Sequence, residues 1–347
     1  MITGMERLVA AINGETSDRI PVFCNLLDQG ADELGMPLQE YYSKGENVAE
    51  GQLRMREKYG YDNVWNLFYV GKEAELLGSG EPLFARNGPP NVKEFIIKEY
   101  DDIHKLEIPD IESHPAFEES LKCMSMLKAE VGGKYPICAY LSSSMTLPAL
   151  LMGMEKWLEL LLIGPTTVRD ELLAKCSEFF QREIAAYRKI GADVLLYSHP
   201  FGSPDILPMK MIRELSIPWM ERDLQPGGVA GVVYYCGSSH FNPVIEQIIE
   251  QLGIGTYYLS PWDDVAEGKE IIAGRGLTCG VINDIKLIDW SEAEIRAEVK
   301  RIIGAGMAGS RFLFGTLVMP YLIPEKNIRA LLDAAYEYGS WEGREQP

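Results

Sequence analysis

Short apolar runs alternate with longer segments of helical periodicity along almost the whole chain, and this alternation limits the fold more than any other feature. The pattern is typical of parallel strands joined by helical crossovers. Because the apolar runs are nearly continuous, we expect both faces of each strand to be covered, as in a barrel. The predicted strands begin at Arg19, Asn63, Tyr135, Asp193, Gly231, Thr256, Leu277 and Arg311. Eight such strands predict an α/β fold of the (β/α)8 TIM-barrel type.

The length and the absence of internal repeats favour a single barrel domain over residues 1–347. The connection between the second and third predicted strands is too long for a simple crossover. It contains a stretch rich in glycine and proline at 78–91 and an acidic stretch at 99–115. We therefore predict an insertion over residues 71–134 that contains a hairpin and covers the barrel mouth.

The charge balance excludes several classes of partner. The chain has 51 acidic and 33 basic residues, which gives a formal net charge of -18. Such a chain repels nucleic acids and anionic membrane surfaces. It also has no secretory signal pattern, no run of apolar residues long enough to span a membrane, and six cysteines without a CxxC pair. We expect a cytoplasmic protein with reduced thiols, and a homodimer is compatible with the sequence.

Polar side chains follow most of the predicted strands, where a barrel of this type assembles its active site. They are Cys24, Asn25, Asp28, Ser142, Ser143, Ser144, His199, Asp205, Cys236, His240, Asp263, Asp264, Cys279, Asn283 and Asp284. Two thiolates from neighbouring strands, Cys236 and Cys279, together with Asp205 on the strand before, form a set of ligands that zinc prefers. The alternative is that both cysteines are small buried core residues, which is the more frequent role of a free cysteine.

Two further chemistries receive weaker support. Cys236 could act as a nucleophile with His240 as its base, but only Gly237 suggests an oxyanion hole. The glycines at 274–276 precede a strand and match no phosphate-binding pattern.

Aromatic residues are dense near the strand ends, which suits a flat, weakly polar substrate. They are Phe23, Trp65, Phe68, Tyr69, Tyr197, Phe201, Tyr234, Tyr235, Tyr257, Tyr258, Trp262, Phe314 and Tyr321.

Several blocks occur in a fixed order along the chain, among them "DRIPVFCNLL", "GADVLLYSHPFGSPDILPMKMIREL", "SPWDDVAEGKEII" and "GVINDIKLIDWSEAEIRAEVKRII". These blocks resemble those of the uroporphyrinogen decarboxylase superfamily, which also contains corrinoid-dependent methyltransferases. The resemblance spans nearly the whole chain and is weakest in the insertion. It implies a single (β/α)8 barrel.

The departures from the family patterns bear on the reaction. Decarboxylases of the family carry an arginine-rich "RQAGR" block after the first strand, whereas this chain has "DQGAD" with Asp28 and Asp32. Acidic residues there oppose the carboxylates of a tetrapyrrole substrate. Methylcorrinoid:thiol methyltransferases have an HxC zinc motif and a late cysteine. Here the histidine is Tyr234, Cys236 matches the first cysteine, and the late cysteine falls at about Leu317.

The resemblance therefore leaves two arrangements open: either no zinc is bound, or Cys279 and Asp205 join Cys236 as ligands. Our hypothesis is a methyltransferase that moves a methyl group from a methoxylated aromatic to the cobalt(I) of a corrinoid protein, in an anaerobic O-demethylase system. The partner brings the corrinoid, and His199, Tyr234, His240 and Asn283 position the ether. The alternatives are a coenzyme M-type or methylamine-type methyltransferase, a uroporphyrinogen decarboxylase, and a barrel that only binds a ligand or partner.

Overall fold

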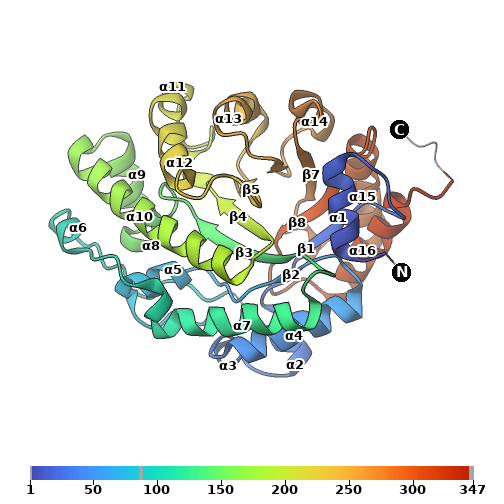
Figure 1. Cartoon of the computed structure of the whole chain (residues 1–347), viewed down its shortest axis with the longest axis horizontal. Helices are drawn as coiled ribbons and strands as arrows, with labels where there is room; N and C mark the ends of the chain where they lie inside the picture. Colours follow the sequence, from blue (N-terminus) through green and yellow to red (C-terminus); the bar gives the residue numbers. More distant parts are fainter. Residues whose placement is uncertain (1, 86–88, 344–347) are drawn as a thin grey trace.

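Parallel strands form one sheet at the centre of the structure, and helices surround it (Figure 1). The computed structural model describes residues 2–85 and 89–343. Within these ranges the sheet has eight strands, as predicted, and the fold is a (β/α)8 TIM barrel. The strands are β1 (Val22–Asn25), β2 (Val64–Trp65), β3 (Ile137–Ser142), β4 (Val194–Ser198), β5 (Val232–Tyr235), β6 (Thr256–Tyr258), β7 (Leu277–Ile282) and β8 (Phe312–Val318).

Helices follow the strands in the order that a parallel barrel requires. The longest helices between strands are α4 (Gly45–Tyr59) after β1, α7 (Pro115–Val131) after β2, α10 (Thr166–Ile190) after β3 and α15 (Glu292–Gly306) after β7. The helices are α1 (Gly4–Asn13), α2 (Gln29–Leu34), α3 (Leu38–Tyr42), α4 (Gly45–Tyr59), α5 (Lys72–Ala74), α6 (Asp101–Lys105), α7 (Pro115–Val131), α8 (Leu147–Met152), α9 (Met154–Leu162), α10 (Thr166–Ile190), α11 (Met209–Met211), α12 (Ile217–Leu224), α13 (Ile245–Leu252), α14 (Val265–Ile272), α15 (Glu292–Gly306) and α16 (Glu325–Gly339).

The two strands at the ends of the hydrogen-bonded order, β1 and β2, are joined largely by side chains. Asp62 accepts from the Val22 amide at 2.8 Å, and Asn63 Oδ1 accepts from the Cys24 amide at 2.9 Å. The indole of Trp65 donates to the Cys24 carbonyl at 2.8 Å, and one backbone bond runs from the Asp62 amide to the Val22 carbonyl. We call this junction the β1–β2 seam.

Alternate strand residues separate into an inner and an outer core, because successive side chains in a strand point to opposite faces. The inner core fills the barrel and includes Phe23, Leu196, Tyr235, Tyr258 and Cys279. The outer core lies between the strands and the helices and includes Val22, Leu195, Tyr234, Cys236 and Tyr257. The face to which a strand residue belongs therefore decides whether it can reach the barrel interior.

The segment 71–134 contains α5, α6 and α7. Because α7 contacts α4 and β3, it occupies the position of the crossover helix between β2 and β3. Leu83 and Asn91 form an antiparallel bridge within the stretch where a hairpin was predicted, and residues 86–88 of that stretch lie outside the described residues.

Helix α1 precedes the first strand and lies at the N-terminal end of the barrel, where Leu8 and Ala11 join the inner core. A capping box between Thr3 and Glu6 begins the helix. At its other end, Arg311 donates to the carbonyls of Ile12 and Asn13. These contacts fix α1 across the opening at the N-terminal end of the barrel.

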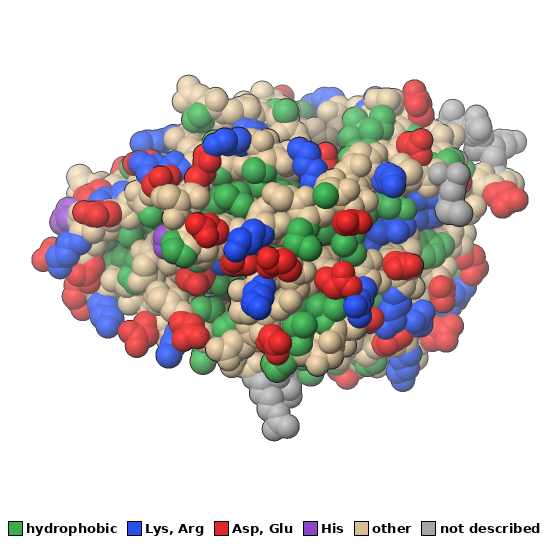
Figure 2. Space-filling model, turned by 60° about the horizontal axis from the view of Figure 1, so that its bottom comes forward, with side chains coloured by type: hydrophobic (Ala, Val, Ile, Leu, Met, Phe, Trp, Pro, Cys, Tyr) green, Lys and Arg blue, Asp and Glu red, His purple; other side chains and the backbone are tan. Residues whose placement is uncertain are grey.

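The surface agrees with the mixed charge of the sequence. On the face shown in Figure 2, acidic and basic side chains are interspersed rather than separated by sign. Among the helices in the described ranges, none is both long enough and apolar enough for a membrane span.

Candidate active site at the C-terminal ends of the strands

His199 follows β4 but is completely buried in the outer core. Its Nδ1 lies 2.9 Å from Ser143 Oγ, and its Nε2 lies 2.7 Å from Ser216 Oγ. Gly202 allows this packing, because a Cβ at that position would lie 1.9 Å from His199 Nε2. Burial lowers the pKa of His199 to about 3, so the imidazole is neutral near pH 7. His199 therefore connects three chain segments behind the strands, with both ring nitrogens occupied.

The buried neutral state of His199 should make the protein sensitive to acid. The unfolded chain binds a proton at this residue near pH 6.5, whereas the folded chain does so near pH 3, so stability falls as the pH falls through this interval. At pH 5 the expected loss is about 2 kcal/mol relative to neutral pH. Urea unfolding at pH 7 and pH 5 should show a smaller difference for His199→Gln than for the wild type. His104→Gln, at a side chain that is 61% exposed, is the control, and an equal difference in all three proteins would contradict the assignment.

Tyr234 and Cys236 also lie on the outer face of the barrel. The ring of Tyr234 stacks on Phe241 with centroids 4.4 Å apart, and its side chain is 1% exposed. Cys236 Sγ donates to the Ser239 carbonyl at 2.9 Å. Burial raises the pKa of both side chains well above their usual values, so the thiol and the phenol are protonated at neutral pH.

Cys279 lies on the opposite face from Cys236. Tyr235, Tyr258 and Cys279 are register partners across β5, β6 and β7, and all three belong to the inner core. Cys236 follows Tyr235 by one residue, so its side chain points to the outer core. The register therefore keeps the two thiols apart.

Asp205 is bound to His240 on the exposed rim. Its carboxylate accepts from the His240 amide at 2.9 Å, and His240 Nδ1 lies 3.0 Å from Asp205 Oδ1. In the described residues, no group of three or more His, Cys, Asp or Glu side chains is arranged to hold a metal ion. Asp205, Cys236 and Cys279 therefore do not fit a zinc site, and we assign no chemical step to zinc.

The separation of the two thiols leads to a direct expectation. Cys236→Ala and Cys279→Ala should each behave as substitutions of a small core residue and lower the free energy of unfolding by about 1 kcal/mol. Neither should change the metal content of the purified protein. Metal analysis and urea unfolding of both variants would check this, and loss of stoichiometric zinc in both would contradict the arrangement.

Asn283 and Asp284 follow β7. Asn283 Oδ1 accepts from the Lys286 amide at 3.1 Å and so fixes the turn after the strand. Asp284 is 9% exposed and has no cationic partner among the described residues. Burial raises the pKa of Asp284 to about 6, which suits a proton acceptor near neutral pH.

Four aromatic side chains form a continuous row on the inner side of the barrel. Phe68 stacks on Tyr140 with centroids 4.0 Å apart, Tyr140 meets Tyr235 edge to face at 5.9 Å, and Tyr235 meets Tyr258 at 6.0 Å. We call these residues the inner aromatic row. Tyr140 also hydrogen-bonds with Ser198 at 2.8 Å, and the charge of Asp284 adds to burial in raising the pKa of Tyr235. Asp284 therefore lies near enough to act electrostatically on this row.

Buried amides without partners lie at the C-terminal ends of β1 and β2. In the described structure, both polar side-chain atoms of Asn25 and of Asn66 are buried without a hydrogen-bond partner, as is Gln29 Oε1. Asn25 and Asn66 follow Cys24 and Trp65, which touch across the β1–β2 seam. Leaving such groups unpaired costs about 1–3 kcal/mol each, and in native proteins they often mark functional sites.

Sequence reasoning did not select Tyr140, Asn66 or Asp284 as site residues. Asp284 was visible as an acidic residue after a strand, and its neighbour Asn283 was chosen instead. Tyr140 lies within a strand, so only its inner face marks it as part of the site. Asn66 gives no signal in the sequence, because its lack of partners is a property of packing.

Known proteins of one family are similar to this chain over nearly its whole length. The family model described as Uroporphyrinogen decarboxylase (URO-D) matches residues 3–338. The methylcobamide:CoM methyltransferase MtaA of Methanosarcina barkeri is 23% identical over 96% of this chain and 97% of its own length. The methylcobamide:CoM methyltransferase MtbA of Methanosarcina acetivorans is also 23% identical, over 97% of this chain and 98% of its own length.

The solved structures are similar in fold. A methyltransferase from Methanosarcina mazei superposes with a TM-score of 0.83 at 22% identity and covers 97% of this chain and 99% of its own. A putative vitamin-B12 independent methionine synthase from Listeria monocytogenes gives a TM-score of 0.55 at 12% identity, with coverage of 92% and 97%. Together with the match of the family model over residues 3–338, the barrel places this chain in the uroporphyrinogen decarboxylase family.

Proposed function

We propose that this protein is a corrinoid-dependent methyltransferase that transfers a methyl group between a corrinoid protein and a small molecule bound at the barrel mouth. The observation that carries this proposal is the similarity over 96–97% of the chain to methylcobamide:CoM methyltransferases. The same relatives favour a small thiol as the methyl acceptor. This is the alternative to the aryl ether hypothesis drawn from the sequence.

In this reaction the acceptor thiol must lose its proton before it attacks the methyl group. We assign the proton to the carboxylate of Asp284, which has a pKa of about 6 and no competing cation in the described structure. The sulfur then forms a bond to the methyl carbon, the carbon–cobalt bond breaks, and its electron pair remains on the cobalt. The partner's corrinoid supplies this activated methyl group. The inner aromatic row excludes water beside the reacting sulfur.

An aryl methyl ether as methyl donor is the second candidate, and the inner aromatic row favours it. Phe68, Tyr140 and Tyr235 offer ring faces and edges to a flat substrate, and the Tyr140 hydroxyl could donate to a developing phenolate.

Decarboxylation of a tetrapyrrole has little support. Asp28 and Asp32 stand where the decarboxylases carry arginines, and they accept from Tyr42 and Tyr321 at 2.6 and 2.5 Å.

One experiment separates these functions. The protein is mixed with a methylated corrinoid protein and a small thiol, or with the cobalt(I) corrinoid protein and a panel of methoxylated aromatics. Appearance of the cobalt(I) absorption band with the thiol supports the thiol methyltransferase, and its loss with an aromatic supports the ether demethylase. Absence of both changes, with tight binding of the corrinoid protein, would favour a barrel that only binds its partner.

The face of this barrel at the C-terminal ends of the strands offers a surface on which the corrinoid protein could dock. Trp262, Ile285 and Leu322 follow β6, β7 and β8, and they are 55%, 68% and 54% exposed. Large apolar side chains that are this exposed on neighbouring loops often mark a partner surface. We propose that these residues contact the corrinoid protein around the barrel mouth.

Trp262→Ala should therefore weaken binding of the corrinoid protein about 30-fold, the effect of a loss of about 2 kcal/mol at an aromatic anchor. The turnover number at saturating partner should change little. Val9→Ala, an exposed residue of α1 at the opposite end of the barrel, is the matched control. Titrations with the corrinoid protein check this, and equal dissociation constants for both variants would rule out this docking surface.

A further inference from the structure

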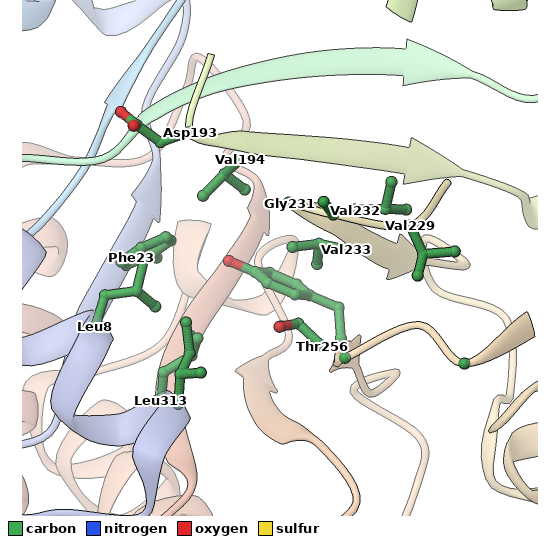
Figure 3. A pocket seen from close by; sticks show the side chains of 15 residues that line it. Leu8, Phe23, Asp193, Val194, Val229, Gly231, Val232, Val233, Thr256 and Leu313 are labelled. Atoms are coloured by element: carbon green, nitrogen blue, oxygen red, sulfur yellow. The ribbon is translucent and has the colours of Figure 1, made fainter. Parts of the chain in front are cut away.

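A cavity of about 330 Å³ lies at the N-terminal end of the barrel, away from the loops that follow the strands. Leu8 and Ile12 of α1 line one side, and the first residues of β4, β5 and β6 line the other. Figure 3 shows Phe23, Val194, Val233 and Leu313 around this space. We call it the lower cavity.

The lower cavity exists because α1 covers only part of the barrel opening. The helix contacts β8, and Arg311 and Ser310 bind the carbonyls at its C-terminal end. On the side of β5 and β6, the lining includes Gly231, Gly253 and Gly255, which have no side chains to fill the space. Close packing elsewhere in the core makes this opening a distinct feature.

The chemistry of the lining is simple. Most of the side chains are aliphatic or aromatic, and Asp193 lies at the exposed edge. The Asp193 carboxylate points away from the surrounding apolar side chains in Figure 3 and accepts from the Ile137 amide at 2.9 Å. Thr256 belongs to the lining, and its hydroxyl makes no hydrogen bond to any described residue. A ligand would therefore meet a mainly apolar wall that also carries the hydroxyls of Thr256 and Tyr258.

We propose that the lower cavity binds a small, uncharged, mainly apolar molecule with one hydrogen-bonding oxygen, of the size of a bicyclic phenol. Ligand pockets begin at about 300 Å³, and an apolar cavity of about 150 Å³ already holds benzene, so the volume suits two fused rings. An anion is disfavoured by the apolar lining, by Asp193 at the edge and by the net charge of -18. The cavity shares Tyr258 with the inner aromatic row, but its proposed ligand takes no part in the methyl transfer.

The test uses 2-naphthol, a neutral fluorescent phenol, titrated into the full-length protein. Saturable one-to-one binding is expected for the wild type. Thr256→Phe should weaken it at least tenfold, because the ring fills the cavity. Thr256→Val keeps the shape and removes the hydroxyl, so it should weaken binding about fivefold. Thr167→Phe, on the exposed first turn of α10, should bind like the wild type.

Two results would overturn the proposal. One is no saturable binding of 2-naphthol to the wild type. The other is unchanged binding in Thr256→Phe, which would place the probe elsewhere, for example at the barrel mouth. Circular dichroism and urea unfolding of both Thr256 variants show whether they are folded, and Thr256→Val decides the outcome if the larger substitution unfolds the protein. The anion 2-naphthoate should bind at least tenfold more weakly than 2-naphthol.

Discussion

Asp284→Asn should lower kcat/KM for methyl transfer to a thiol about 10²- to 10⁴-fold, the usual contribution of a positioned general base. The asparagine side chain has nearly the same shape as aspartate but cannot take the proton from the thiol. Burial makes the charged carboxylate less favourable in the folded protein than in water and raises the pKa of Asp284 to about 6. The variant should therefore fold at least as stably as the wild type at pH 7, which isolates the chemical defect.

The pH dependence gives a second reading of the same residue. The reactive form is the carboxylate, so the wild-type rate should fall about tenfold for each pH unit below the pKa of about 6. Asp284→Asn should lose this acidic limb, and its defect should shrink with thiols that are already ionised. Asp289→Asn, at an exposed carboxylate in the same loop, is the control. A wild-type pH profile in Asp284→Asn would show that another group accepts the proton.

Asp62→Ala should lower the free energy of unfolding by about 3–5 kcal/mol, the cost of leaving buried cations without their partner. The Asp62 side chain is fully buried, while those of Arg7 and Arg19 are 10% and 13% exposed. Its carboxylate accepts from Arg7 Nη1 at 2.9 Å, from Arg19 Nη2 at 3.0 Å and from the Val22 amide at 2.8 Å. One substitution therefore removes the charge that holds α1, β1 and the start of β2 together.

Urea unfolding of matched variants checks this expectation. Asp18→Ala also removes a carboxylate from Arg7, but the Asp18 side chain is 47% exposed, so its loss should cost about 1 kcal/mol or less. Asp62→Asn should fall between the two alanine variants, since it keeps an acceptor and loses the charge. Equal losses for Asp18→Ala and Asp62→Ala would mean that burial of the ion pair adds nothing to stability.

The strands of this barrel could be predicted from the sequence, because burial on both faces leaves a nearly continuous apolar run. Runs such as "DVLLYSHP" from Asp193 and "LTCGVIN" from Leu277 coincide with β4 and β7. The same property hides the faces of the strands: where every residue is apolar, alternation cannot show which side chains point inward. Cys236 follows β5 as expected, but Cys279 lies inside β7, and the sequence could not show which face either thiol occupies.

The candidate site depends on strand register and side-chain packing. Neither can be deduced from the spacing of residues along the sequence. Tyr235 faces the inner core and Tyr234 the outer core, although both are tyrosines beside the same cysteine. His199 illustrates a second limit, because only the structure shows that Ser143 and Ser216 occupy both of its ring nitrogens. The reaction itself depends on a partner and a small molecule that leave little trace in the chain.

The β1–β2 seam has a consequence for how this barrel can change over evolutionary time. Between the other neighbouring strands, most hydrogen bonds join backbone groups, which do not depend on the identity of the side chain. At the seam, the amides of Val22 and Cys24 rely on the side chains of Asp62 and Asn63. Substitution of Asp62 or Asn63 would therefore remove a hydrogen bond between β1 and β2, so sequence change at these two positions is more restricted than at most strand positions of the barrel.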